Sequence, residues 1–116
     1  MLSSKLKIKR ASFSEVLSRG KSFHSPSFTL RVLKKKSLHE EPSSFSFVVS
    51  QKIAKKATAR NLLKRRGYTV IKKLLGNIKP CYICVFFAKK EFARLRSAEL
   101  EKEVFLLLKK AGIMKS

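Results

Sequence analysis

The chain has 116 residues, a length that fits one domain, and 44% of them are hydrophobic, which is enough for a single core. Lysine and arginine number 28 against seven acids, so the formal net charge is +21, and a polyanion would most readily relieve this self-repulsion. All the acids are glutamates and the chain has only two histidines and two cysteines, which argues against nucleases built on clustered aspartates and against the usual four-ligand zinc sites.

A short amphipathic helix is the first element that the sequence predicts, over residues 12–19. Ser12 and Glu15 have the spacing of a capping box, in which each side chain accepts a hydrogen bond from the backbone amide of the other residue. The apolar residues of this segment share one helical face: Phe13, Val16 and Leu17. Gly20 follows and favours the left-handed conformation that commonly ends a helix.

Two strands are expected next, because apolar and polar side chains alternate over residues 28–33 and again over residues 45–50. The polar segment 34–44 between them is typical of a solvated turn. The two runs therefore suit an antiparallel hairpin with one buried face. A small additional edge strand is expected near residues 21–24.

A basic helix is predicted over residues 58–75. Its apolar residues recur at helical spacing: Ala59, Leu63, Val70, Ile71 and Leu74. Gly67 lies on the same stripe, where the absence of a side chain allows a close approach to the sheet. Gly76 and then Pro80 should end this helix.

One more strand and one more helix complete the chain. Residues 81–88 are almost entirely apolar and follow Pro80, which favours a central strand over a helix. The last helix is expected to begin at Ser97, a suitable N-cap, and to end at Gly112. Glutamates lie near its start and lysines near its end, which suits the helix dipole.

These elements give the order helix, two or three strands, helix, strand, helix. That order is typical of an α+β fold with a single small, mostly antiparallel sheet and helices packed mainly on one face. We expect a single domain over residues 1–116, with a basic tail over about residues 1–10. No apolar run is long enough to cross a membrane and no signal peptide is evident, so we expect a cytoplasmic protein with no membrane partner.

The positive charge is concentrated between Pro42 and Lys90, a stretch that contains no acid. On the predicted basic helix, Lys56, Arg60 and Lys64 are four residues apart and share a face, where like charges destabilise an isolated helix by a few tenths of a kcal/mol per pair. A nucleic acid is the partner that this stripe favours. A merely solvated helix face is one alternative, and an anionic membrane surface is another, although the latter calls for an exposed apolar face with Trp or Phe.

The segment from Ser50 to Arg66 resembles the protein subunit of bacterial ribonuclease P. In that family a strand ends in Ser-x-Lys, a short loop follows, and an Arg-Asn pair with a later basic pair opens a helix. Here Arg60 and Asn61 match the first pair, whereas Lys64 and Arg65 match the later one: SQKIAKKATARNLLKRR. Two positions depart from the family, since Leu62 and Thr69 stand where arginines are common. Either this chain makes fewer contacts there, or Arg66 and Lys72 compensate.

The resemblance covers nearly the whole chain and implies a fold and a function. The fold is the ribonuclease P protein-like α+β sandwich with a left-handed βαβ crossover. The function is that of a monomeric RNA-binding domain in a ribonucleoprotein, which assists a catalytic RNA in removing the 5′ leader of precursor tRNA. The enzyme is then an endoribonuclease, but the RNA binds most of the Mg²⁺ and performs the hydrolysis, so no catalytic residue is expected in the protein.

Two sets of site residues follow from the resemblance. The implied RNA-binding residues are Lys52, Lys55, Lys56, Arg60, Asn61, Lys64, Arg65 and Arg66. The implied leader-binding cleft contains Phe13, Leu17, Phe28 and Arg31. Leu17 replaces a common Phe and Arg31 a common Tyr, which implies less stacking and more electrostatic holding of the leader. Packing in the core is the competing role for both Phe13 and Phe28.

Other functions fit the sequence less well. A structural RNA-binding protein, such as a small ribosomal protein, suits the charge equally, but the Arg60–Asn61 helix opening together with the Phe13 helix favours the ribonuclease P subunit. A DNA-compacting protein would normally show a dimer interface or minor-groove arms, and a protein-only nuclease would need more carboxylates. Cys81 and Cys84 have zinc-knuckle spacing, but on a strand they would point to opposite faces, so no metal site is expected.

Overall fold

The computed structural model describes residue 8, residues 10–36 and residues 40–115, so most of the expected basic tail lies outside the described residues. The elements in chain order are α1 (Arg10–Arg19), β1 (Lys21–His24), β2 (Phe28–Lys34), β3 (Ser44–Val48), α2 (Ala57–Leu74), the 3-10 helix η2 (Leu75–Asn77), β4 (Tyr82–Ala88), the 3-10 helix η3 (Lys90–Arg94) and α3 (Ser97–Lys110). This order confirms the predicted α+β class, including the edge strand near residues 21–24.

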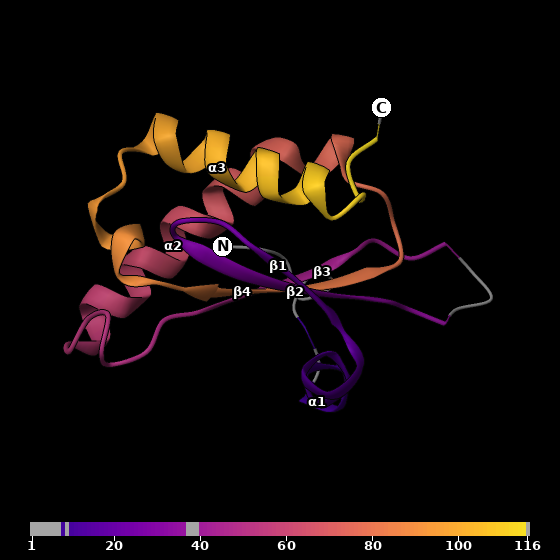
Figure 1. Ribbon diagram of the computed structural model, residues 1–116, viewed down its shortest axis with the longest axis horizontal. Helices are drawn as coiled ribbons and strands as arrows, with labels where there is room; N and C mark the ends of the chain where they lie inside the picture. Colours follow the sequence, from indigo (N-terminus) through magenta and orange to yellow (C-terminus); the bar gives the residue numbers. More distant parts are fainter. Residues whose placement is uncertain (1–7, 9, 37–39, 116) are drawn as a thin grey trace.

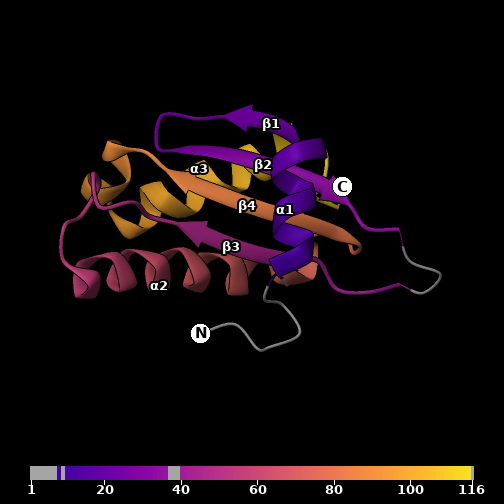
Figure 2. The same ribbon diagram turned by 90° about the horizontal axis from the view of Figure 1, so that it is seen from below.

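The molecule has three layers, and the middle layer is a four-stranded sheet of order β1-β2-β4-β3. Helices α2 and α3 cover one face of the sheet and α1 crosses the other (Figures 1 and 2). The sheet is mixed, because β1 with β2 and β2 with β4 are antiparallel whereas β3 with β4 is parallel. We call the side with α1 the α1 face and the opposite side the core face.

The predicted hairpin between residues 28–33 and 45–50 is wrong. Strand β4 lies between those two strands, so that Phe86 faces Leu30 of β2 on one side and Phe47 of β3 on the other. The true hairpin joins β1 to β2. Because β4 is apolar on both faces, the central position removes most of its surface from water.

The unit β3-α2-β4 is a left-handed crossover, as the family resemblance implies. In Figure 2 both strands run to the left with α2 behind the sheet, and β4 lies above β3. Turned so that the strands point upwards, β4 is to the right of β3 with the helix behind, which is the left-handed arrangement. About 98% of such parallel connections are right-handed, so this geometry is a distinctive property of the fold.

Aromatic packing on the core face holds α2 against the sheet. The rings of Phe47 and Phe86 stack with their centroids 4.7 Å apart. A Cβ atom on Gly67 would lie 2.6 Å from the Phe47 ring, so the glycine permits the close helix-to-sheet approach that its position predicts. The unpredicted element η3 adds Phe92, which is fully buried in the same cluster.

Two helix starts differ from their predicted positions. α1 begins at Arg10, two residues before Ser12, so the predicted capping box with Ser12 as N-cap is wrong. α3 has Arg96 as its N-cap in place of Ser97, and the Arg96 amide donates to Glu99 Oε1 at 3.1 Å. Helix α2, by contrast, begins and ends within one residue of its predicted bounds.

Candidate nucleic-acid interface

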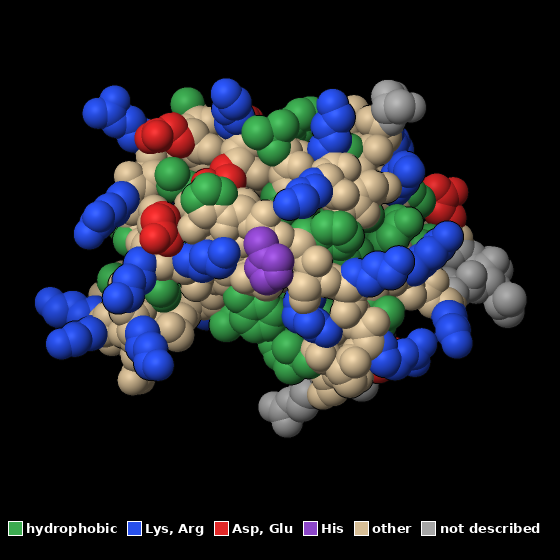
Figure 3. Space-filling model, in the orientation of Figure 1, with side chains coloured by type: hydrophobic (Ala, Val, Ile, Leu, Met, Phe, Trp, Pro, Cys, Tyr) green, Lys and Arg blue, Asp and Glu red, His purple; other side chains and the backbone are tan. Residues whose placement is uncertain are grey.

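A dense group of basic side chains surrounds the start of α2. Residues 51–53 form a turn, and Lys56 is the extended N-cap of α2, with φ −81° and ψ 137° and no side-chain cap bond. The first turn of α2 contains no acid, so its free backbone amides and the positive end of the helix dipole add to the charge of the lysines. Figure 3 shows Lys and Arg side chains gathered at this end of the molecule, at the lower left.

Arg60 ties this loop to the helix with only part of its guanidinium. Its Nη1 atom donates to the carbonyl oxygens of Ala54 at 3.0 Å and Lys55 at 2.7 Å. Within the part of the chain that the structure describes, Nε and Nη2 form no hydrogen bond. Because a guanidinium can direct two donors at one phosphate, Arg60 is able to hold the loop and bind a phosphate at the same time.

Three basic side chains of α2 lie beside its buried stripe, whereas the other basic side chains of the helix point outwards. At 100° per residue, Arg60 and Lys64 fall on one border and Arg66 on the other. Arg66 Nη2 donates to the carbonyl oxygen of Leu95, which ties α2 to the segment before α3. The structure therefore separates Arg66 from the other predicted RNA-binding residues and gives it a structural contact.

The other seven predicted RNA-binding residues lie together on the loop and the outward side of α2. We call this group the α2 surface: Lys52, Lys55, Lys56, Arg60, Asn61, Lys64 and Arg65. Five of the side chains are exposed, whereas Arg60 and Lys64 are half-buried. No ion pair among the described residues involves any of them. A cluster of cations without carboxylate partners is suited to the phosphates of a nucleic-acid backbone.

The α1 face carries a smaller apolar cluster. Val16 of α1 is fully buried against Ile83 and Val85 of β4. Phe13 is half-buried beside this cluster, and Leu17, one turn further along α1, is 46% exposed. The structure thus places these two predicted cleft residues on one helix, at the border of a partly open sheet face.

A row of half-buried side chains continues this surface across the sheet. Thr29, Phe87 and Val48 are register neighbours on β2, β4 and β3. Strand β3 ends at Val48 and the loop to α2 follows, so the row lies at the sheet end from which the α2 surface begins. Sequence reasoning missed Phe87 because residues 81–88 are apolar throughout, and no alternation shows which rings face α1.

The prediction that Phe28 lines the leader cleft is wrong. Its side chain is fully buried on the core face, where it contacts Phe47, Phe86 and Phe92 with centroid distances of 5.9, 5.7 and 4.7 Å. The alternation of β2 explains this placement, because it directs Phe28 to the side opposite Arg31. A ring enclosed by other rings cannot stack on a bound base.

Arg31 lies on the α1 face as expected, but its guanidinium is occupied by the end of α1. It donates to the carbonyl oxygens of Val16 at 3.1 Å, Leu17 at 2.9 Å and Gly20 at 2.9 Å, and to Ser22 Oγ at 2.7 Å. These carbonyls lie at the C-terminal end of α1, where the Val16 carbonyl also accepts the Gly20 amide at 2.9 Å, so Arg31 caps the negative end of the helix dipole. Its role is to position α1 on the sheet.

Cys84 of β4 is fully buried in the core. Burial raises the pKa of the Cys84 thiol far above its usual range, which Lys35 offsets only in part, and the thiol stays protonated.

Among the described residues, no group of three His, Cys, Asp or Glu side chains is placed to hold a metal ion. None of the described helices is long and apolar enough to cross a membrane.

Known proteins resemble this chain in sequence and in fold. A family model described as ribonuclease P matches residues 3–112. The ribonuclease P protein component of Rippkaea orientalis is 34% identical over 104 residues, which cover 88% of this chain and 82% of that protein. The component from Synechococcus sp. (strain JA-2-3B'a(2-13)) is 36% identical over 75 residues, 65% of this chain but only 56% of that protein. The structure of the RNase P protein from Thermotoga maritima superimposes with a TM-score of 0.78 at 27% identity, covering 90% of this chain and 96% of that one.

Proposed function

The chain belongs to the ribonuclease P family as the protein component of this tRNA-processing endoribonuclease, and we propose that its α2 surface binds the catalytic RNA while its α1 face holds the 5′ leader of precursor tRNA. One copy of the protein then acts in the cytoplasm as part of a ribonucleoprotein. The alternative, a small ribosomal protein, has no support among the relatives described above.

The observation that carries the proposal is the unpaired charge of the α2 surface. Six of its seven residues are cations, and none of them has a carboxylate partner among the described residues. If each cation neutralises one phosphate, RNA affinity should fall by about three decades between roughly 50 and 200 mM salt. Arg60 supplies a directional contact, and Asn61 can both donate and accept, which fixes the orientation of the RNA backbone.

The leader is a single strand whose sequence differs between precursors, so it requires a tolerant surface. Phe13 and Phe87 offer ring surface on the α1 face, and base stacking on an aromatic ring is worth about 1–3 kcal/mol whatever the base. Arg31 contributes by holding α1 in place. The row from Phe87 to Val48 then leads a bound strand from α1 towards the start of α2.

The hydrolysis itself is assigned to the RNA subunit. Mg²⁺ ions bound mainly by the RNA would supply the Lewis acid and the activated water. The protein contributes positively charged side chains that lower the repulsion between two RNA molecules. This division predicts that the protein matters most when Mg²⁺ is scarce.

Reconstitution tests the proposal directly. Leader removal from a precursor tRNA by a bacterial-type catalytic RNA is measured at low Mg²⁺, with and without the full chain. We expect strong stimulation at low Mg²⁺, which weakens when Arg60 and Asn61 are both replaced by Ala. Raising Mg²⁺ should partly restore the cleavage activity of the variant complex. Lys102→Gln is the matched control, because Lys102 is an exposed cation on α3, away from both surfaces. No stimulation by the wild-type chain, or cleavage by the protein alone, would contradict the proposal.

A further inference from the structure

We propose that a hollow at the far corner of the core face binds one unpaired nucleotide of an RNA strand, with the base against Phe23 and Tyr82 and the phosphate on Lys21 and Lys34. We call this hollow the corner pocket. Its volume is about 390 Å³, within the range of small-molecule sites. The inference rests on the proposed function only in that the ligand is RNA.

The register of three strands builds the pocket. Lys21 of β1 pairs with Val32 of β2, and Tyr82 of β4 pairs with Lys34 of β2. Side chains two residues apart on a strand share a face, so Phe23 joins the same side as Lys21. These five residues therefore all point to the core face, with the buried Val32 as the floor of the pocket and the others around it.

The pocket lies at the C-terminal end of α3. The helix ends at Lys110, and Ala111 forms one wall of the hollow. Gly112, with φ 78°, then redirects the chain, so that the next residues pair with the segment after α2: Ile78 bridges Met114. Residues 113–115 thus pack beside the segment after α2 and leave the hollow open.

The side chains around the pocket suit a nucleotide. Phe23 and Tyr82 are half-buried rings, which provide stacking surface, and Lys21 and Lys34 are exposed cations. Neither lysine side chain forms a hydrogen bond or ion pair with another described residue. None of the described residues that line the pocket is acidic. Rings next to free cations are the combination that binds single-stranded RNA, whereas an apolar peptide would leave the lysines unused.

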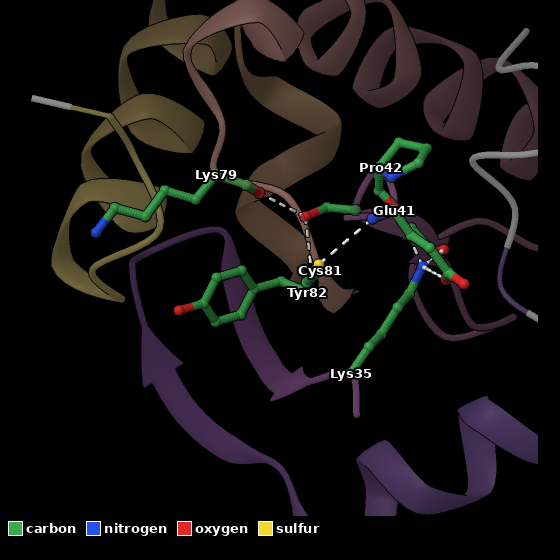
Figure 4. A network of polar contacts seen from close by, with 8 residues as sticks. Lys35, Glu41, Pro42, Lys79, Cys81 and Tyr82 are labelled. Carbon is green, nitrogen blue, oxygen red and sulfur yellow. Dashed lines mark hydrogen bonds and ion pairs between the residues drawn. The ribbon is translucent and has the colours of Figure 1, made fainter. Parts of the chain in front are cut away.

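The backbone of Tyr82 is held in place by hydrogen bonds. Its backbone amide donates to Ser43 Oγ at 3.0 Å, and the same hydroxyl donates to the carbonyl oxygen of Lys79 at 2.6 Å. The preceding Cys81 amide donates to the carbonyl oxygen of Glu41 at 2.8 Å. Figure 4 shows the Tyr82 ring pointing away from this network and from the side chain of Lys35. A hydrogen-bonded strand end therefore does not have to order its backbone when a ligand binds.

The corner pocket is separate from the interface already described. Tyr82 lies at the first residue of β4, whereas Phe87, which leads towards the α2 surface, lies near its last. Five residues of extended strand place these two positions roughly 16 Å apart. Most of the pocket lining lies on the core face, whereas the row from Phe87 to Val48 lies on the α1 face, although Arg19 and Leu33 reach the pocket from the α1 side at this corner.

A titration followed by amide NMR on the full chain reads the two regions separately. The probe is a 5′-phosphorylated triadenylate RNA. We expect saturable shifts of the amides around Phe23 and Tyr82. The Kd obtained from these shifts should rise about fivefold or more in Tyr82→Leu. Combining Lys21→Gln with Lys34→Gln should raise the same Kd. Phe105→Leu is the matched control, because Phe105 is an exposed ring on α3 outside the pocket, and it should change nothing.

Four results would overturn the proposal. They are shifts confined to the α1 face and the α2 surface, an unchanged Kd in Tyr82→Leu, equal shifts with inorganic phosphate alone, and binding of free AMP as tight as that of the triadenylate. The last two would assign the pocket to a simple anion or to a free nucleotide. Failure of the proposed function would instead appear as absent stimulation of the catalytic RNA, which this titration does not measure.

Discussion

Arg31 on β2 and Leu17 on α1 are joined by a 2.9 Å hydrogen bond from the guanidinium to the carbonyl oxygen. The same guanidinium also reaches Val16 and Gly20, so one strand residue closes the C-terminal end of α1, the helix beside the proposed leader-binding surface. The position of Phe13 and Leu17 over the sheet therefore depends on a cation that does not itself have to contact RNA.

Arg31→Lys should loosen α1 without changing the net charge. A lysine can satisfy only part of this set of acceptors, so we expect the free energy of unfolding to fall by about 1–2 kcal/mol. Precursor tRNA should bind less tightly, because the leader surface loses its fixed geometry. Urea denaturation and filter binding measure the two effects. Arg19→Lys is the control, since Arg19 makes only an exposed ion pair with Glu15, and an equal effect there would contradict the role of Arg31.

Glu103→Ala should destabilise the fold more than most surface changes. The Glu103 carboxylate on α3 accepts hydrogen bonds from the Ser25 hydroxyl at 2.6 Å and from the Ser27 amide and hydroxyl at 2.7 and 2.9 Å. Ser27 is fully buried, so its donors would lose their partner, at an expected cost of about 2–4 kcal/mol. Glu101→Ala on the same helix removes only an exposed pair with Lys73 and should cost about 0.5 kcal/mol or less by urea unfolding. Similar losses of stability in the two variants would show that the turn at residues 25–27 does not depend on Glu103.

Two glycines should respond in opposite directions to alanine. At Gly67 the new methyl group would meet the buried Phe47 ring, and overpacking should outweigh the better helix propensity by about 1–2 kcal/mol. At Gly76 no atom lies within 4 Å of the new methyl group, so the change should be neutral or stabilise by up to about 1 kcal/mol. Thermal unfolding distinguishes the two. Gly67→Ala should lower the stability, and adding Phe47→Leu should restore part of it. If either result failed, the approach of α2 to the sheet would not be limited by the contact between residues 67 and 47.

Arg65 and Arg66 are neighbours in the sequence but should differ in function. Arg65 is exposed on the α2 surface, so Arg65→Gln should weaken binding of the catalytic RNA and lower the salt slope by about one, with stability unchanged. Arg66 is bonded to Leu95, so Arg66→Gln should lower stability by about 1 kcal/mol and change RNA affinity little. RNA titrations at several salt concentrations test this pair, and the reverse pattern would place the RNA on the α3 side of α2.

Local patterns in the sequence were sufficient to predict most elements, whereas strand pairing required the structure. Hydrophobic periodicity located α2 within one residue, and the alternation of Phe28, Leu30 and Val32 identified β2 and its buried face. The same alternation could not show that β4 separates β2 from β3, because strand neighbours are set by contacts between residues far apart in the chain.

The site shows the same limit at the level of single residues. The basic cluster before and within α2 is contiguous in sequence, so its members could be named from the sequence alone. The separation of Arg66 from Arg60 depends on which border of the helix meets α3, and the occupation of Arg31 depends on where α1 ends. Phe87 was missed because only the register with Thr29 and Val48 places its ring on the α1 face.

Phe13→Ala should distinguish precursor from mature tRNA. Phe13 is half-buried beside Val16, so its ring has surface available to an unpaired base, and losing that contact should weaken precursor binding about fivefold or more. Mature tRNA has no leader, so its affinity should not change. Val16→Ala is the matched control, because it creates a cavity under the same helix and lowers stability without removing a ring. Equal losses for both tRNAs in Phe13→Ala, or a selective loss in Val16→Ala, would mean that Phe13 acts through the packing of α1 and that the leader lies elsewhere.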